Sequence, residues 1–166
     1  MTSFKNKVIV VTGAASGIGL AICERFAKAG AALGLLDMDA ERLKAAEKKL
    51  CDGGVRCLSV PCDVSSRDAC NTAIGQILDH FGGIDVLVNN AGITQRSAFV
   101  DTDIAVFEKV MAVNFFGSLY CTKAAIHSLI ERKGLIIVNE SIAGIAPLLG
   151  RTGYSASKHA LHGLFT

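Results

Sequence analysis

Tyr154 and Lys158 are the residues of this sequence whose types and spacing best suit acid–base chemistry. They lie four residues apart in the segment Tyr-Ser-Ala-Ser-Lys, so a helix would place both on one face. An ammonium group about 4 Å from a phenolate attracts it by about 4 kcal/mol at an effective dielectric constant of about 20. The lysine would therefore favour the phenolate that a proton-exchanging tyrosine needs. The pair alone is weak evidence, because such spacings are common on helix surfaces.

A glycine-rich turn near the N-terminus is a second chemical feature. It reads Thr-Gly-Ala-Ala-Ser-Gly-Ile-Gly over residues 12–19 and follows a β-branched apolar run at 8–11. Apolar residues then recur at helical spacing, beginning with Ile18 and Ile22, so a helix starts near Gly17. Free N–H groups at a helix start bind anions, and glycines let a pyrophosphate approach closely. The alternative is a tight turn that binds nothing.

Asp37 follows the second apolar run, 18 residues after Gly19. A carboxylate at about this distance from the glycine turn accepts hydrogen bonds from a ribose diol. It would also repel a 2′-phosphate, and the neighbouring Met38 is neutral. These residues favour NAD over NADP. The other reading, a helix cap, is better filled by Asp39.

The elements that must position these residues alternate along the whole chain. Apolar runs predict strands at 8–11, 32–36, 55–60, 85–88 and 135–139. Helical patterns begin near residues 17, 39, 66 and 154, and a longer one covers about 103–133 with a bend near 114–117. This β-α-β series predicts one α/β domain over residues 1–166, a doubly wound parallel sheet of the Rossmann type.

Small or polar residues follow each predicted strand. They are Thr12 and Gly13, Asp37, Asp63, Asn89 and Asn90, and Ser141. Because ligands bind outside the carboxyl ends of parallel strands, we expect these residues to border one site. For any single strand, a polar residue at its end needs no such explanation.

The composition excludes several other classes of protein. The chain has 166 residues, of which 51% are hydrophobic, and a net charge of +2. Its densest basic stretch, 44–49, contains Glu47, which disfavours nucleic acid binding. No apolar run approaches the length of about 18 residues that a membrane-spanning helix needs. The first strand begins within a few residues of the start, so we expect no signal peptide and a cytoplasmic protein.

The six cysteines are predicted to be reduced thiols, most of them small core residues. They are Cys23, Cys51, Cys57, Cys62, Cys70 and Cys121, and no two have zinc-ligand spacing. His159 and His162 are three residues apart on the last predicted helix, without an acidic or thiol ligand near them in sequence. We therefore expect no metal site.

Taken together, these motifs resemble the short-chain dehydrogenase/reductase family. The resemblance rests on the turn at 12–19, the segment Asn-Asn-Ala-Gly at 89–92, Asn114, Ser141, and Tyr154 with Lys158. Ser141 and Tyr154 are 13 residues apart, as is usual in that family. The family's fold agrees with the one that the strand and helix pattern predicts.

The resemblance implies roles for four catalytic residues. Tyr154 would exchange the proton with the substrate oxygen, and Ser141 would hydrogen-bond that oxygen. Lys158 would bind the nicotinamide ribose and favour the Tyr154 phenolate. Asn114 would hold a water molecule that relays protons.

The resemblance also implies a cofactor site and an activity. Besides Tyr154 and Lys158, the residues expected to bind NAD are Gly13, Ser16, Gly17, Ile18, Gly19, Asp37, Asp63, Val64, Asn90, Ala91 and Gly92. The protein would interconvert a small alcohol and a ketone with NAD. Family members continue beyond this sequence with two further strands, so the alternative is a truncated dinucleotide-binding module without turnover.

Three expectations concern the last third of the chain. Glu140 stands where the family more often has serine, and strand alternation would turn it away from Ser141. The apolar loop 145–153 would line a substrate pocket or pack on its own domain. The resemblance implies that, in the full-length protein, the helices at 114–133 and after 154 pair with their copies in a homodimer or homotetramer. In the present sequence the last helix is cut short and would expose apolar residues such as Leu161, Leu164 and Phe165.

Overall fold

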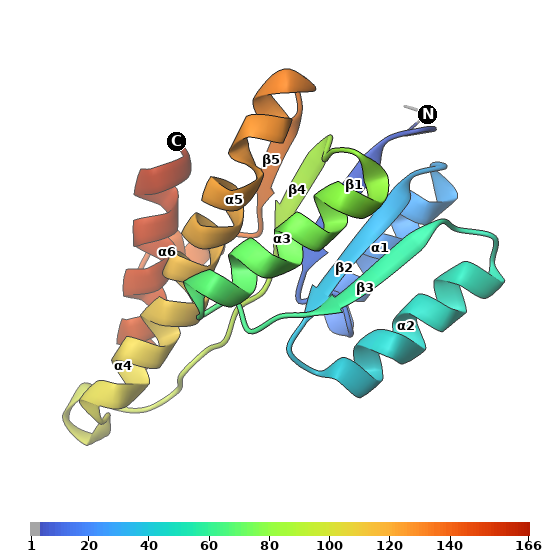
Figure 1. Cartoon of the computed structure of the whole chain (residues 1–166). Coiled ribbons are helices and arrows are strands. Elements are labelled where there is room, and N and C mark those ends of the chain that lie inside the picture. The colour runs from blue at the N-terminus through green and yellow to red at the C-terminus, as the bar shows by residue number, and fades with distance from the viewer. Residues whose placement is uncertain (1–3) are drawn as a thin grey trace.

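Five parallel strands form the centre of the molecule, a computed structural model that describes residues 4–166. The N-terminal segment was predicted not to be a signal peptide, and its first three residues lie outside the described range. The sheet order is β3-β2-β1-β4-β5, with every neighbouring pair parallel (Figure 1). The strands are β1 (Val8–Thr12), β2 (Ala32–Asp37), β3 (Cys57–Pro61), β4 (Val86–Asn89) and β5 (Leu135–Val138). This topology confirms the predicted doubly wound sheet.

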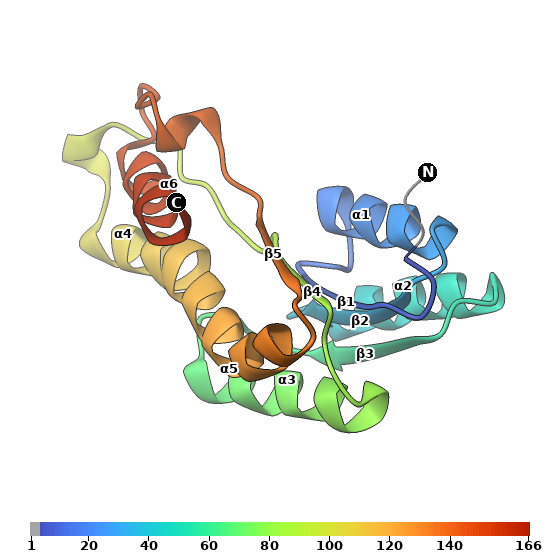
Figure 2. The ribbon, with the colours of Figure 1, turned by 90° about the horizontal axis from the view of Figure 1, so that it is seen from above.

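Helices cover both faces of the sheet. One face carries α1 (Gly17–Lys28) and α2 (Ala40–Asp52), and the other carries α3 (Arg67–Phe81) and α5 (Gly117–Glu131) (Figure 2). The helices α4 (Ile104–Met111) and α6 (Thr152–Phe165) pack against each other, farther from the middle strands. Short 3₁₀ turns, η1 (Phe99–Asp101) and η3 (Ile142–Gly144), lie in the loops before α4 and α6.

The two-sided core explains why β1 is apolar throughout. All five of its residues are buried. Ile9 and Val11 face the layer of α1 and α2, whereas Val10 faces the layer of α3 and α5. A central parallel strand meets a helix layer on each face, so alternation of polar and apolar residues is lost.

Helix boundaries follow local capping chemistry. Asp39 accepts a hydrogen bond from Arg42 N at the start of α2, as expected, and Ser66 accepts one from Ala69 N at the start of α3. The expected bend near 114–117 is a π-helical segment, η2 (Ala112–Phe116), between α4 and α5. π-helical segments are rare, and most of them are single turns inside α-helices, frequently at functional sites.

Three sequence predictions need correction. The third strand begins at Cys57 rather than residue 55, and the last helix begins at Thr152 rather than 154. Leu161 is buried in the fold, so it is not part of an exposed apolar surface, unlike Leu164.

The continuous helix Ile104–Glu131 is long and apolar enough, by length and composition alone, to cross a membrane. The sequence reading did not foresee this, because no unbroken apolar run reaches that length. Here α5 packs on α3 and contributes Cys121, Ala125 and Leu129 to the core.

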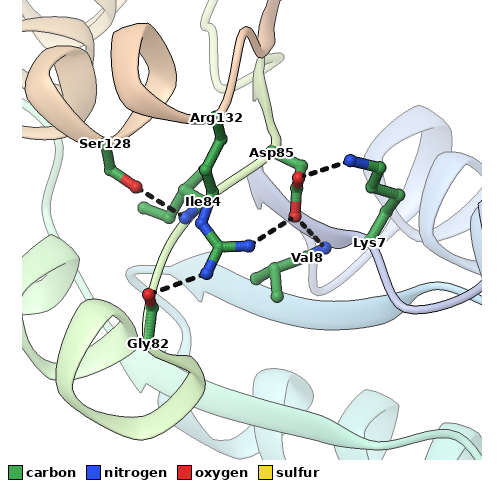
Figure 3. A network of polar contacts seen from close by, with 7 residues as sticks. All are labelled: Lys7, Val8, Gly82, Ile84, Asp85, Ser128 and Arg132. Carbon is green, nitrogen blue, oxygen red and sulfur yellow. Dashed lines mark hydrogen bonds and ion pairs between the residues drawn. The ribbon is translucent and has the colours of Figure 1, made fainter.

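Asp85 joins the amino ends of β1 and β4 (Figure 3). Its buried carboxylate accepts hydrogen bonds from Lys7 Nζ (2.8 Å), Val8 N (3.0 Å) and Arg132 (3.3 Å). Burial disfavours the carboxylate, but these hydrogen bonds and the charges of Lys7 and Arg132 outweigh it, so the pKa of Asp85 is lowered. This network lies at the edge opposite the candidate site described next.

Candidate active site

The loops after β1 and β4 lie next to each other at the centre of the sheet. From β1 the strand order continues through β2 and β3 to one side, and from β4 it continues through β5 to the other side. Thr12 Oγ1 accepts hydrogen bonds from Asn90 N (3.0 Å) and Ala91 N (2.9 Å). Asn90 Nδ2 in turn donates to Thr12 O at 3.0 Å. In doubly wound sheets, ligands bind at this topological switch point.

Glycine occupies the positions of this turn for different structural reasons. A methyl group at Gly19 would collide with the carbonyl oxygen of Gly13. Gly13 itself has a positive φ of +67°. Gly17 has φ +53° and borders open space, where a methyl group would meet nothing within 4 Å. The Ser16 hydroxyl does not cap α1, and Ser16, Gly17 and Ile18 are all exposed. The start of α1 therefore offers free amides and an open surface to an anion.

Asp37 lies at the end of β2, beside the glycine turn. Its carboxylate accepts hydrogen bonds from Ala15 N and Asp39 N, both at 3.0 Å. A carboxylate has about four acceptor sites, so two of them remain for a diol. The nearby Arg42 guanidinium is paired with Asp39 at 3.3 Å. Its charge is thus partly neutralised.

Asp63 and Val64, after β3, point in different directions. Asp63 is exposed, and its carboxylate accepts hydrogen bonds from Ser65 N and Ser65 Oγ. The Val64 side chain is buried in the core, where it would touch any side chain added at Gly117. Of these two predicted cofactor residues, only Asp63 presents its side chain at the edge.

A hydrogen-bonded chain connects the glycine turn with Lys158. Asn139 Nδ2 donates to Asn90 Oδ1 at 2.9 Å, and Lys158 Nζ donates to Asn139 O at 2.7 Å. Lys158 is 5% exposed. Burial lowers the pKa of Lys158, whereas the charge of Glu140 acts to raise it.

Tyr154 and Lys158 face each other on the first turns of α6. Lys158 Nζ lies 5.8 Å from the centre of the Tyr154 ring. Tyr154 N donates to Gln95 Oε1 at 3.2 Å, which fixes the start of the helix on the loop after β4. Ser141 follows β5, and its Oγ accepts from Ala143 N at 3.2 Å.

Asn114 lies in η2 and is fully buried. Its Oδ1 accepts from Ile93 N (2.8 Å), and its Nδ2 donates to Ile93 O (3.0 Å) and Ser157 Oγ (2.9 Å). The side chain therefore joins the loop after β4 to α6. Its predicted water relay stays a prediction.

Glu140 forms a contact that sequence reasoning missed. Its carboxylate lies 3.1 Å from His162 Nδ1, two turns along α6 from Tyr154. From the sequence, His162 stood out only as a possible metal ligand together with His159. Within residues 4–166, no group of three or more His, Cys, Asp or Glu residues could hold a metal ion. The separation of 22 residues between Glu140 and His162 gives no local signal for their pairing.

Two further residues of the site were not singled out from the sequence. Gln95 anchors Tyr154 N, and Arg151 donates to Thr94 Oγ1 at 2.6 Å. The first contact joins the loop after β4 to α6, and the second joins that loop to the loop after β5. The apolar loop beyond Ser141 is open rather than packed, since Leu149 is wholly exposed.

The sheet topology, glycine turn and paired Tyr154 and Lys158 define an α/β protein of the dinucleotide-binding type. The family model described as short chain dehydrogenase matches residues 7–166. The chain belongs to the short-chain dehydrogenase family, which confirms the resemblance seen in its motifs.

Individual relatives support this assignment. Over 165 residues the chain is 38% identical to the mouse dehydrogenase/reductase SDR family member 7, covering 96% of this chain and 49% of the relative. It is 41% identical to the Arabidopsis thaliana 11-beta-hydroxysteroid dehydrogenase-like 2, covering 94% and 51%. The chain thus spans about half the length of the curated relatives it matches.

Solved structures are similar over nearly the whole chain. An NAD⁺-bound xylitol dehydrogenase matches with a TM-score of 0.94 and 35% identity, covering 98% of this chain and 64% of that one. A short-chain dehydrogenase/reductase from Burkholderia phymatum in complex with NAD matches with a TM-score of 0.95 and 30% identity, covering 99% and 59%.

Proposed function

We propose that this protein is an NAD-dependent oxidoreductase that interconverts an alcohol and a ketone. The observation that carries the proposal is the buried Lys158 ammonium, which faces the Tyr154 ring and is tied through Asn139 to the glycine-turn loops. The NAD-bound solved structures named above support the choice of cofactor.

The residues at the carboxyl edge fit a dinucleotide. The open surface at Gly17 and the free amides of α1 would receive the pyrophosphate. The Asp37 carboxylate would accept hydrogen bonds from the hydroxyl groups of the adenine ribose. Asp63, with the backbone of Val64, would lie beside the adenine. Asn90, Ala91 and Gly92 would support the second ribose. When bound, NAD supplies the hydride acceptor or donor.

The chain's own residues move the proton. Tyr154 takes the proton from the alcohol oxygen, or returns it to the ketone oxygen, while Ser141 hydrogen-bonds the same oxygen. The Lys158 ammonium stabilises the phenolate formed on Tyr154. Asn114 holds the Ile93 backbone and thereby fixes the loop that borders the site.

The substrate, assembly and location belong to the same proposal. The exposed apolar residues Ile145 and Leu149 follow Ser141 and suit a partly hydrophobic, uncharged alcohol or ketone. The half-exposed Phe116, just before α5, and Leu164 of α6 support a homodimer or homotetramer of the full-length protein through these helices. We place the protein in the cytoplasm, without nucleic acid or membrane partners.

Two readouts on the purified protein test the function and separate it from a binding module. The first is NADH binding, followed by nicotinamide fluorescence. The second is turnover of a panel of secondary alcohols with NAD and of ketones with NADH. We expect binding and turnover. Binding without turnover would support the dinucleotide-binding module instead, and absence of both would contradict the cofactor site.

A further inference from the structure

Cys51 and Cys57 form a thiol pair far from the candidate active site. Cys51 is in the last turn of α2, and Cys57 is the first residue of β3, at the edge of the sheet opposite the glycine turn. Their sulfur atoms lie 2.6 Å apart. Both cysteines are free, and their sulfur atoms are farther apart than in a disulfide bond, about 2.05 Å.

The backbone between the two cysteines holds them in this arrangement. Gly54 N donates to Cys51 O (2.8 Å), and Val55 N donates to Leu50 O (3.1 Å). Gly54 reverses the chain with φ +81°, a conformation that glycine adopts without strain. Cys57 is in register with Leu33 of β2. The fold therefore brings the last turn of α2, with Cys51, next to the start of β3, with Cys57.

Exposure distinguishes this pair from the other cysteines. Cys51 is exposed and Cys57 is half-buried. The remaining four are buried, namely Cys23, Cys62, Cys70 and Cys121. Cys70 and Cys121 also approach each other, at 3.6 Å, but neither has exposed surface. A dissolved oxidant thus reaches Cys51 before any other thiol.

We propose that Cys51 and Cys57 are a redox modification site. A small disulfide such as oxidised glutathione oxidises the two thiols, which then form a reversible disulfide bond with each other. The Cys51 thiolate attacks one sulfur of the oxidant, whose S–S bond breaks and releases one glutathione thiolate. The Cys57 thiolate then attacks the Cys51 sulfur and releases the second. Two protein thiols are oxidised to one disulfide, two glutathione molecules are formed, and the two thiol protons pass to the released thiolates.

The second step sets the rate of closure. Burial, the contact with Cys51 and the nearby Glu47 raise the pKa of Cys57 to about 12. In the mixed disulfide the Cys51 sulfur is no longer a thiol, so burial and the charge of Glu47 are the causes that still raise the pKa of Cys57. Because the Cys57 thiolate is the attacking group, closure is faster at higher pH.

Peptide mapping of the purified protein tests this proposal. The protein is incubated with oxidised glutathione, its free thiols are alkylated, and it is digested with trypsin without reductant. Cleavage after Lys49, Arg56 and Arg67 separates the two cysteines into peptides 50–56 and 57–67. We expect these peptides to be linked, with fragmentation placing the bond on Cys57 rather than Cys62, and dithiothreitol to separate them.

Two surface variants serve as matched controls. Cys57→Ser should keep a glutathione adduct on Cys51, because no second thiol resolves it. Cys51→Ser should show neither adduct nor link. Wild-type protein without the linked peptides, or a link on peptide 50–56 that persists in Cys57→Ser, would overturn the proposal.

Discussion

Asp37 is the residue on which cofactor choice depends in the proposed function. Its carboxylate faces the glycine turn and keeps two acceptor sites after binding Ala15 N and Asp39 N. The negative charge favours a ribose diol and repels a 2′-phosphate.

Replacing Asp37 with arginine should therefore reverse the preference. A lost charge-assisted hydrogen bond of about 2 kcal/mol corresponds to about thirtyfold in affinity. In Asp37→Arg, the ratio of NADPH to NADH affinity should rise by about this factor, as measured by fluorescence titration with both cofactors. Asp52→Arg makes the same charge change at the far end of α2 and should leave the ratio unaltered. An unchanged ratio in Asp37→Arg would remove Asp37 from the ribose site.

Glu140 opposes the effect of burial on Lys158. Because its charge raises the pKa of Lys158, Glu140→Gln should lower that pKa further. A lysine with a lowered pKa loses its charge at a lower pH, and neutral Lys158 no longer stabilises the Tyr154 phenolate. The alkaline decline of kcat/KM should therefore begin at a lower pH in Glu140→Gln. The exposed Glu131, changed to Gln, is the control. Superimposable profiles for wild type and Glu140→Gln would contradict this role.

At the scale of elements, the strand–turn–helix unit of β1 and α1 shows how closely the backbone packs. The α1 helix approaches the turn so closely that no Cβ fits at Gly19. The glycine there is required by packing, whereas Gly17 is favoured by its positive φ alone, because an added methyl group would meet open space.

The variant Gly19→Ala should consequently displace the turn. Overpacking at such a contact costs about 2 kcal/mol. We expect NADH binding to weaken by about thirtyfold, as followed by fluorescence titration. Gly75→Ala adds the same methyl group to α3, where it meets no atom, and should bind NADH like wild type. Equal affinities in the two variants would count against the turn as the binding loop.

Sequence patterns predicted the elements better than their ends. The apolar runs identified all five strands, since strands buried on both faces carry apolar residues throughout. The third strand was placed two residues early, because Val55 is apolar but its N–H is used to end α2 at Leu50 O. The start of α6 was placed two residues late, because its anchor, Gln95, lies 59 residues earlier in the chain.

At the scale of the whole molecule, the site residues carried by local motifs were predicted, and those joined by long-range contacts were not. The glycine turn and Tyr154 with Lys158 have short-range spacing that can be read directly. The bonds of Asn139 to Asn90 and of Glu140 to His162 exist only because parallel strands bring distant loops to one edge. No local pattern carries that information.

The Asp85 network ties together the opposite edge and should contribute to global stability. Asp85→Asn removes a buried carboxylate that three donors share, at a cost of about 2 kcal/mol at neutral pH. A depressed folded-state pKa stabilises the fold above the unfolded pKa, and this contribution is lost as the pH falls through the folded value. Urea unfolding of both proteins should thus show a difference that shrinks below about pH 4. Asp68→Asn, at an exposed ion pair, should change stability little. A pH-independent difference for Asp85→Asn would contradict the charge as its cause.

The most direct test of the proposed oxidoreductase is the turnover of Tyr154→Phe beside wild type, with NADH binding measured on the same samples. The phenol oxygen is the only atom removed, so cofactor binding should persist while kcat falls by about 10²–10⁴, the usual contribution of a positioned acid or base. Tyr120→Phe, on α5, makes the same change away from Lys158 and should retain wild-type turnover. Wild-type turnover in Tyr154→Phe would contradict the account.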